Sequence, residues 1–160
     1  MKTHSSLLVA QYLLDKANEA NNPLTPMQLI KLVYLCHGWM IGLHGRSLIS
    51  EDVEAWQYGP VISELYGKIK KYRSNPVLES LCTIPEGEFD ATECSVMDQV
   101  FTLYGSLSGP ALSRLTHASN TPWSITWEYA GKSAVISNDL IQDHFDKLYR
   151  KYSEPAQAVG

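Results

Sequence analysis

Cysteine is scarce in this 160-residue sequence, and the three that occur, Cys36, Cys82 and Cys94, stand at unrelated spacings. Neither a disulfide framework nor a zinc site is therefore expected. Long apolar runs are also missing, because no stretch reaches the roughly 18–20 residues of a membrane span. The apolar stretch at 7–14 is short and no small-residue cleavage site follows it, so it does not indicate a signal peptide. These absences predict a cytoplasmic protein.

Positive charge is in deficit, since the formal net charge is -4. A protein that binds phosphate backbones needs a basic stripe, so nucleic acid is not an expected partner. The one basic cluster, at residues 68–73, lies in the last turn of an expected helix, where cations offset the helix dipole. The cluster therefore has a local explanation that needs no ligand.

Catalytic signatures are missing as well: the sequence has no Gly-x-Ser-x-Gly elbow and no glycine-rich phosphate loop. His37 and His44 share a helix face, but they are seven residues apart without the glutamate pattern of a zinc-binding helix. His117 is expected to brace a loop through Glu128 or a backbone carbonyl, and the acidic run at 86–93 is expected to be a solvated loop. No catalytic residue, metal ligand or cofactor is predicted, and the protein is not expected to be an enzyme.

Helical periodicity is the strongest pattern present. Thr25, Pro26 and Gln28 form a capping box with proline at the first helical position, which predicts a helix over residues 26–43. Because its apolar residues cover nearly every face, this helix should be central and buried. Further helices are expected over 6–20, 60–72, 92–107, 109–115 and 137–152. Residues 77–81 are compatible with a helical turn, 116–127 with a loop, and 128–136 with either a small strand or irregular structure.

The segment at 47–58 changes to a period of two. Val53, Ala55 and Gln57 alternate with residues of the opposite character, which predicts a short strand or hairpin. Gly59 is expected to supply the bend that follows, and Pro60 to begin the next helix. Four aromatic residues lie in or beside turn segments, and they either close the edge of the core or anchor a partner. These four are Trp56, Tyr58, Trp123 and Trp127.

The whole pattern predicts a mainly α, compact, single-domain helical bundle around a buried central helix at about 26–43, with a small β element near 47–58. The domain is expected to span residues 1–153. Residues 154–160 are expected to form a disordered tail.

Three segments, in order, resemble the motifs of one family. Residues 31–39 are similar to its Lys-Leu-x-Tyr-x4-Trp helix, 55–61 to its Ala-Trp-x-Tyr-Gly-Pro-Val motif, and 112–123 to its Leu-Ser-x-Leu-Thr-His motif followed by Pro-Trp. This is the Panacea domain family of SocA-like, or phage-associated GepA-like, antitoxins. The positions that carry the resemblance are Lys31, Leu32, Tyr34, Trp39, Ala55, Trp56, Tyr58, Gly59, Pro60, Thr116, His117, Pro122 and Trp123.

The resemblance implies a helical domain that acts as the antitoxin of a two-gene toxin–antitoxin system and neutralises its cognate toxin by direct protein contact. The toxin would be encoded by the adjacent gene. Many relatives carry an added domain that binds DNA or proteolysis factors, and only the shared domain is expected in this chain. Since the motifs occur in relatives with unrelated toxins, we expect them to be scaffold, with toxin choice in the loops at 73–91 and 117–134. Two alternatives stay open: a proteolytic adaptor that delivers a partner to an ATP-dependent protease, and an enzyme using His117.

Overall fold

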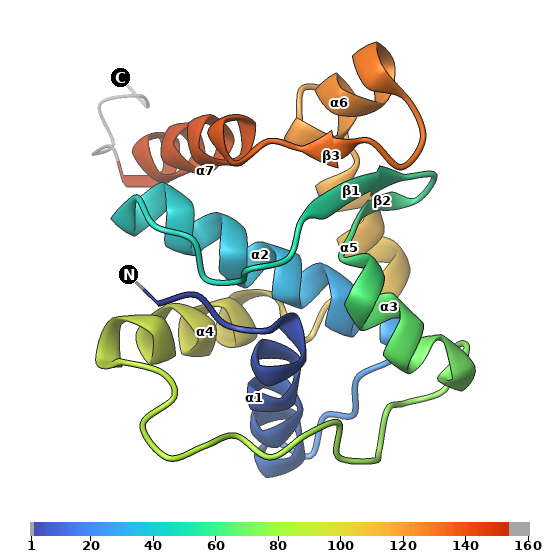
Figure 1. The fold of residues 1–160 in the computed structure, drawn as a ribbon, viewed down its shortest axis with the longest axis vertical. Coiled ribbons are helices and arrows are strands. Elements are labelled where there is room, and N and C mark those ends of the chain that lie inside the picture. The colour runs from blue at the N-terminus through green and yellow to red at the C-terminus, as the bar shows by residue number, and fades with distance from the viewer. Residues whose placement is uncertain (1, 154–160) are drawn as a thin grey trace.

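The computed structural model describes residues 2–153, and these form a bundle of helices around α2 with a small sheet at one end (Figure 1). The helices are α1 (Ser6–Glu19), α2 (Pro26–His44), α3 (Ser63–Ile69), η1 (Lys70–Tyr72), α4 (Ala91–Tyr104), α5 (Gly109–Thr116), α6 (Pro122–Ala130) and α7 (Asn138–Ser153). The strands are β1 (Val53–Trp56), β2 (Gly59–Val61) and β3 (Val135–Ile136). The predicted mainly α fold with a small β element is confirmed. The predicted tail at 154–160 lies outside the described residues.

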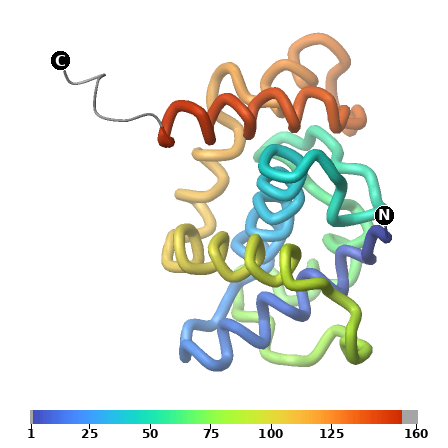
Figure 2. Tube along the Cα trace, turned by 90° about the vertical axis from the view of Figure 1, so that its left-hand side faces the viewer, coloured from blue at the N-terminus to red at the C-terminus, as the bar shows by residue number. Residues whose placement is uncertain are grey.

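Helix α2 is the centre of the fold, as its sequence predicted. The Thr25 side chain accepts from the Gln28 backbone N–H, and the Gln28 side chain accepts from the Thr25 N–H, which completes the predicted capping box. Gly45 ends the helix in the left-handed conformation at φ 67°. Every residue from 29 to 38 is buried. In Figures 1 and 2, α2 runs between α7 on one side and α1 and α4 on the other. None of the described helices is long and apolar enough to cross a membrane.

Helix α7 approaches α2 closely because two glycines face it. A Cβ built on Gly38 would lie 2.3 Å from Cε2 of Phe145, and one built on Gly42 would lie 2.5 Å from its Cβ. The Phe145 ring therefore occupies the space beside Gly38, its Cβ and backbone occupy the space beside Gly42, and the residue is only 2% exposed. It packs edge-on against Tyr34 and Trp39, with ring centroids 6.0 and 5.1 Å apart. This contact attaches the C-terminal helix to the core.

The sheet has the order β2-β1-β3, and both pairings are antiparallel. Val53 and Ala55 of β1 are buried while Glu54 and Trp56 are partly exposed, as the alternating pattern predicted. The expectation that Pro60 begins a helix was wrong. Pro60 pairs with Ala55 inside β2, and α3 begins only at Ser63. Proline is tolerated there because β2 is an edge strand.

Two further expectations for irregular segments were wrong. Residues 77–81 form no helical turn. The expected loop at 116–127 contains α6, which begins with a capping box between Thr121 and Ser124 and has Pro122 in its first turn. Of the alternatives for 128–136, the small strand is present as β3, although residues 128–130 belong to α6.

The acidic run at 86–93 is not simply a solvated loop. His4, itself buried, is hydrogen-bonded through both ring nitrogens, with Nδ1 2.6 Å from Glu88 Oε2 and Nε2 2.8 Å from Glu93 Oε2. Arg46 adds contacts to Glu93 at 3.3 Å and to Asp90 at 2.9 Å. The carboxylates thus fix the N-terminal segment and the start of α4 to each other.

His37 is a structural residue, as expected, and it predicts a dependence of stability on pH. Its Nδ1 accepts from the backbone N–H groups of Leu48 and Ile49, both at 3.3 Å, and its Nε2–H donates to Asn138 at 3.3 Å, so the ring is neutral. Burial lowers the pKa of His37 from 6.5 to about 4. Between these values the unfolded chain binds a proton that the folded chain does not. The free energy of unfolding should therefore fall by about 3 kcal/mol as the pH drops from 6.5 to 4.

Urea unfolding at a series of pH values tests this expectation on the wild type and on His37→Asn. The other titrating groups are common to both proteins, so the difference between the two curves isolates His37. Parallel curves from pH 6.5 to 4 would show that His37 titrates normally in the folded state.

Candidate functional site

Three helices donate side-chain hydrogen bonds to the carbonyl groups of the β1–β2 hairpin. The Trp123 Nε1–H of α6 donates to the Trp56 carbonyl at 2.6 Å, and the Ser113 hydroxyl of α5 donates to the Tyr58 carbonyl at 2.6 Å. The Lys31 ammonium of α2 donates to the Pro60 carbonyl at 2.9 Å. All three sequence motifs therefore meet at one hairpin, although they are up to 92 positions apart in the chain. This convergence defines the candidate site.

Gly59 is the residue that allows the close approach. Its φ of 119° lies in a region that favours glycine. A Cβ at this position would lie 3.0 Å from Lys31 Nζ and 3.4 Å from both His117 Cβ and Thr116 Oγ1. Without a side chain, the hairpin can rest directly on α2 and on the end of α5.

Lys31 is the most unusual group at the site. Its side chain lies under the hairpin and the residue is 2% exposed. Burial lowers the pKa of its ammonium from 10.5 to about 7. The Pro60 carbonyl is its one hydrogen-bond partner among residues 2–153, and no carboxylate there forms an ion pair with it. A lysine that is buried with so little compensation is a mark of functional sites.

His117 braces the end of α5. Its Nδ1 contacts the Ser113 carbonyl, which confirms the backbone alternative rather than Glu128, and its ring meets Trp123 edge-on at 5.3 Å between centroids. Within the described part of the chain, no Asp or Glu is hydrogen-bonded to His117. The geometry therefore lacks the paired carboxylate that the enzyme alternative needs.

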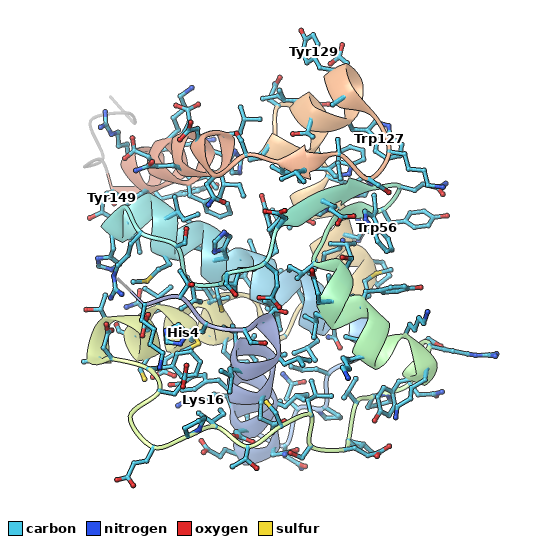
Figure 3. The ribbon with its side chains drawn as sticks, in the orientation of Figure 1. His4, Lys16, Trp56, Trp127, Tyr129 and Tyr149 are labelled. Carbon is cyan, nitrogen blue, oxygen red and sulfur yellow. The ribbon has the colours of Figure 1, made fainter. Side chains whose placement is uncertain are left out.

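A cavity of about 440 Å³ opens beside the hairpin. Its walls include Trp56, Tyr58 and Tyr66, and the Trp56 and Tyr66 rings pack edge-on with centroids 5.1 Å apart. The Tyr58 side chain is 62% exposed at the hairpin tip. Figure 3 shows Trp56 on this side of the molecule, near the hairpin. The cavity joins aromatic surface to an exposed turn, which is the composition of many protein-binding sites.

The other motif residues lie in the core, at helix ends or away from the hairpin. Leu32, Tyr34 and Ala55 are core residues, and Pro122 and Thr116 are buried at helix ends. Trp39 lies away from the hairpin, where its Nε1–H donates to the Tyr104 hydroxyl at 3.1 Å. The structure thus gathers Lys31, the residues at 56–60 and those at 116–123, but not Trp39.

The residues of the site that were not predicted include Tyr66, Arg73, Ser113 and Lys132. Ser113 stands inside a recognised motif, so the sequence did carry a signal for it. Arg73 and Lys132 come from separate connecting segments, and only the fold brings them to one cavity. No group of three His, Cys, Asp or Glu side chains within residues 2–153 is placed to hold a metal ion.

The fold and the cavity define a small helical domain with a pocket built on a β-hairpin. The family model described as "Antitoxin SocA-like, Panacea domain" matches residues 29–124, which contain all three motifs, so the chain belongs to this family. It is 32% identical over 150 residues to Antitoxin SocA of Caulobacter vibrioides (strain NA1000 / CB15N), across 86% of this chain and 80% of that protein. No solved structure matches the chain.

Proposed function

We propose that this protein is a cytoplasmic antitoxin that neutralises a cognate protein toxin by binding it directly. Membership of the SocA-like antitoxin family supports the antitoxin role. The observation that carries direct binding is the aromatic cavity beside the exposed Tyr58. Specific interfaces depend on a few aromatic or arginine anchors, and this face offers both.

The two loops expected to choose the toxin both reach this cavity. Arg73 begins one loop and Lys132 lies in the other, and both line the cavity beside Trp56. The second segment also presents Tyr129, which is 84% exposed and projects from the end of α6, away from Trp56 (Figure 3). We therefore propose an interface with a common anchor at the hairpin and selective contacts from the flanking segments.

The direct test is co-expression with the product of the adjacent gene. If that product arrests growth alone, this protein should restore growth, and the two should elute together in size-exclusion chromatography. An adjacent gene product that does not arrest growth would contradict the proposal that the two proteins form a toxin–antitoxin pair. The half-life of the toxin separates simple occlusion from proteolytic delivery: a stable toxin supports occlusion, and a shortened half-life supports an adaptor.

Two aromatic substitutions separate an effect on stability from an effect of the flanking segment on toxin binding. Trp56 is half-buried and packs on Tyr66, so Trp56→Ala should lower the free energy of unfolding by about 2 kcal/mol. Tyr129 is exposed, so Tyr129→Ala should change stability by less than about 0.5 kcal/mol and weaken toxin binding by roughly 30-fold, as loss of an interface anchor does.

Urea unfolding and a binding titration with the toxin measure the two effects separately. Thr92→Ala, in α4, which lies across α2 from α6 (Figure 1), serves as a control that should bind normally. Normal toxin binding by Tyr129→Ala would remove the segment at 117–134 from the interface.

A further inference from the structure

The ionisable side chains that line the cavity in basic or acidic form are all basic. The lining contains Lys31, Arg73 and Lys132 and no carboxylate, in a chain whose net charge is -4. Glu54 does not line the cavity, although its carboxylate accepts the Trp56 Nε1–H at 2.9 Å and keeps its charge. The cavity therefore differs from the rest of the molecule in presenting a local positive field.

Lys31 has hydrogen-bonding capacity that the protein leaves unused. An ammonium group has three N–H donors, and among residues 2–153 the only acceptor for them is the Pro60 carbonyl. The residue is 98% buried yet lines the cavity. Two of the three donors thus have no acceptor among the described residues and could bind an added acceptor group.

The remaining walls are apolar. Met27, Ile30 and Val61 contribute aliphatic surface, and Trp56 and Tyr66 contribute aromatic surface. Such walls suit an apolar side chain and would leave a bare phosphate or a nucleic-acid backbone without partners for most of its oxygens. The exposed cations, Arg73 and Lys132, stand on the two loops at the rim.

We propose that this cavity binds an acidic segment of the toxin, in which an Asp or Glu carboxylate forms an ion pair with Lys31 and a neighbouring apolar side chain packs against Trp56. Arg73 and Lys132 steer and hold the same acidic segment at the rim. This inference rests on the proposed function for the identity of the partner, but the carboxylate site itself does not.

Binding should be linked to protonation of Lys31. With a pKa of about 7, Lys31 is largely neutral at pH 8 in the free protein. An ion pair with a carboxylate favours the ammonium form. Complex formation at pH 8 should therefore take up about one proton from the buffer.

Two dipeptides with blocked termini serve as probes. They are N-acetyl-Phe-Glu-amide, which carries one carboxylate, and its uncharged counterpart N-acetyl-Phe-Gln-amide. In an NMR titration of the full chain, the Glu peptide should shift the Trp56 indole signal, and the Gln peptide should bind at least roughly tenfold more weakly. Calorimetry at pH 8 in buffers of different ionisation enthalpy should detect proton uptake with the Glu peptide. Equal affinity of both peptides, or no shift at about 10 mM, overturns the proposal.

Variants of the protein test which residues produce the preference for the Glu peptide and the proton uptake. Lys31→Met keeps the side-chain volume and should lose both the preference for Glu and the proton uptake. The exposed pair Arg73→Gln/Lys132→Gln should weaken the Glu peptide several-fold, while the matched pair Lys70→Gln/Lys71→Gln, whose residues do not line the cavity, should not. An unchanged preference for Glu in Lys31→Met, with native-like unfolding, overturns the role of Lys31.

Co-expression with the toxin separates this inference from the proposed function. If the wild type restores growth and Arg73→Gln/Lys132→Gln restores it equally well, the acidic anchor is wrong and the antitoxin function stands. If the wild type does not restore growth, the function is wrong, while the peptide titration still decides the cavity. Preferential binding of inorganic phosphate or a single-stranded oligonucleotide over the Glu peptide also overturns the proposal.

Discussion

Phe145→Ala is expected to lower the free energy of unfolding by about 4 kcal/mol, a large part of the total stability of a domain of this size. Phe145 is 2% exposed, and its ring fills the space that Gly38 leaves on α2. Its removal would leave a cavity beside Tyr34 and Trp39 that the glycines cannot fill. Urea denaturation followed by circular dichroism measures the change.

Tyr149→Ala is the matched control, because Tyr149 lies on the same helix but is 49% exposed. Its effect should stay below about 1 kcal/mol. The converse substitution, Gly42→Ala, should also destabilise the protein, by about 2 kcal/mol, since the new Cβ would meet both the Phe145 Cβ and the α7 backbone. Near-wild-type stability of Phe145→Ala would mean that α7 contributes little to the core.

Local signals explain which parts of this fold could be predicted. The ends of α2 were predicted because Thr25, Gln28 and Gly45 act within one turn of the helix they bound. Helix α6 carries the same kind of signal in Thr121 and Pro122, so its start was also predictable from the sequence. Pairing of Pro60 with Ala55 had no such signal, because Gly59-Pro60 is equally suited to a turn that begins a helix.

The candidate site depended on contacts that no local pattern contains. Lys31 was selected by its resemblance to a family motif, and nothing in its neighbours indicates that it lies under a hairpin 29 positions away. The expectation that the motif is scaffold remains a prediction. The hydrogen bonds from Trp123, Ser113 and Lys31 support it, and the exposure of Tyr58 beside the cavity gives the same motif a surface that a partner can reach.

The buried Lys31 predicts a large dependence of stability on pH near neutrality. Its pKa is 10.5 when exposed to water and about 7 in the folded protein. Between these values the unfolded chain binds the proton and the folded chain does not, so raising the pH favours the folded state. The full difference corresponds to about 5 kcal/mol, of which about 2 kcal/mol should develop between pH 7 and pH 9.

Lys31→Met removes this titration and is the reference for the measurement. Urea unfolding of both proteins at intervals from pH 7 to 9 should show the wild type gaining about 2 kcal/mol relative to the variant. Burial raises the pKa of Tyr34 and Cys36, which favours the unfolded state at higher pH. Both proteins share these groups, so their effect cancels in the difference. A constant difference across this range would mean that the folded protein keeps Lys31 charged, and the proton uptake expected on binding a carboxylate would then be absent as well.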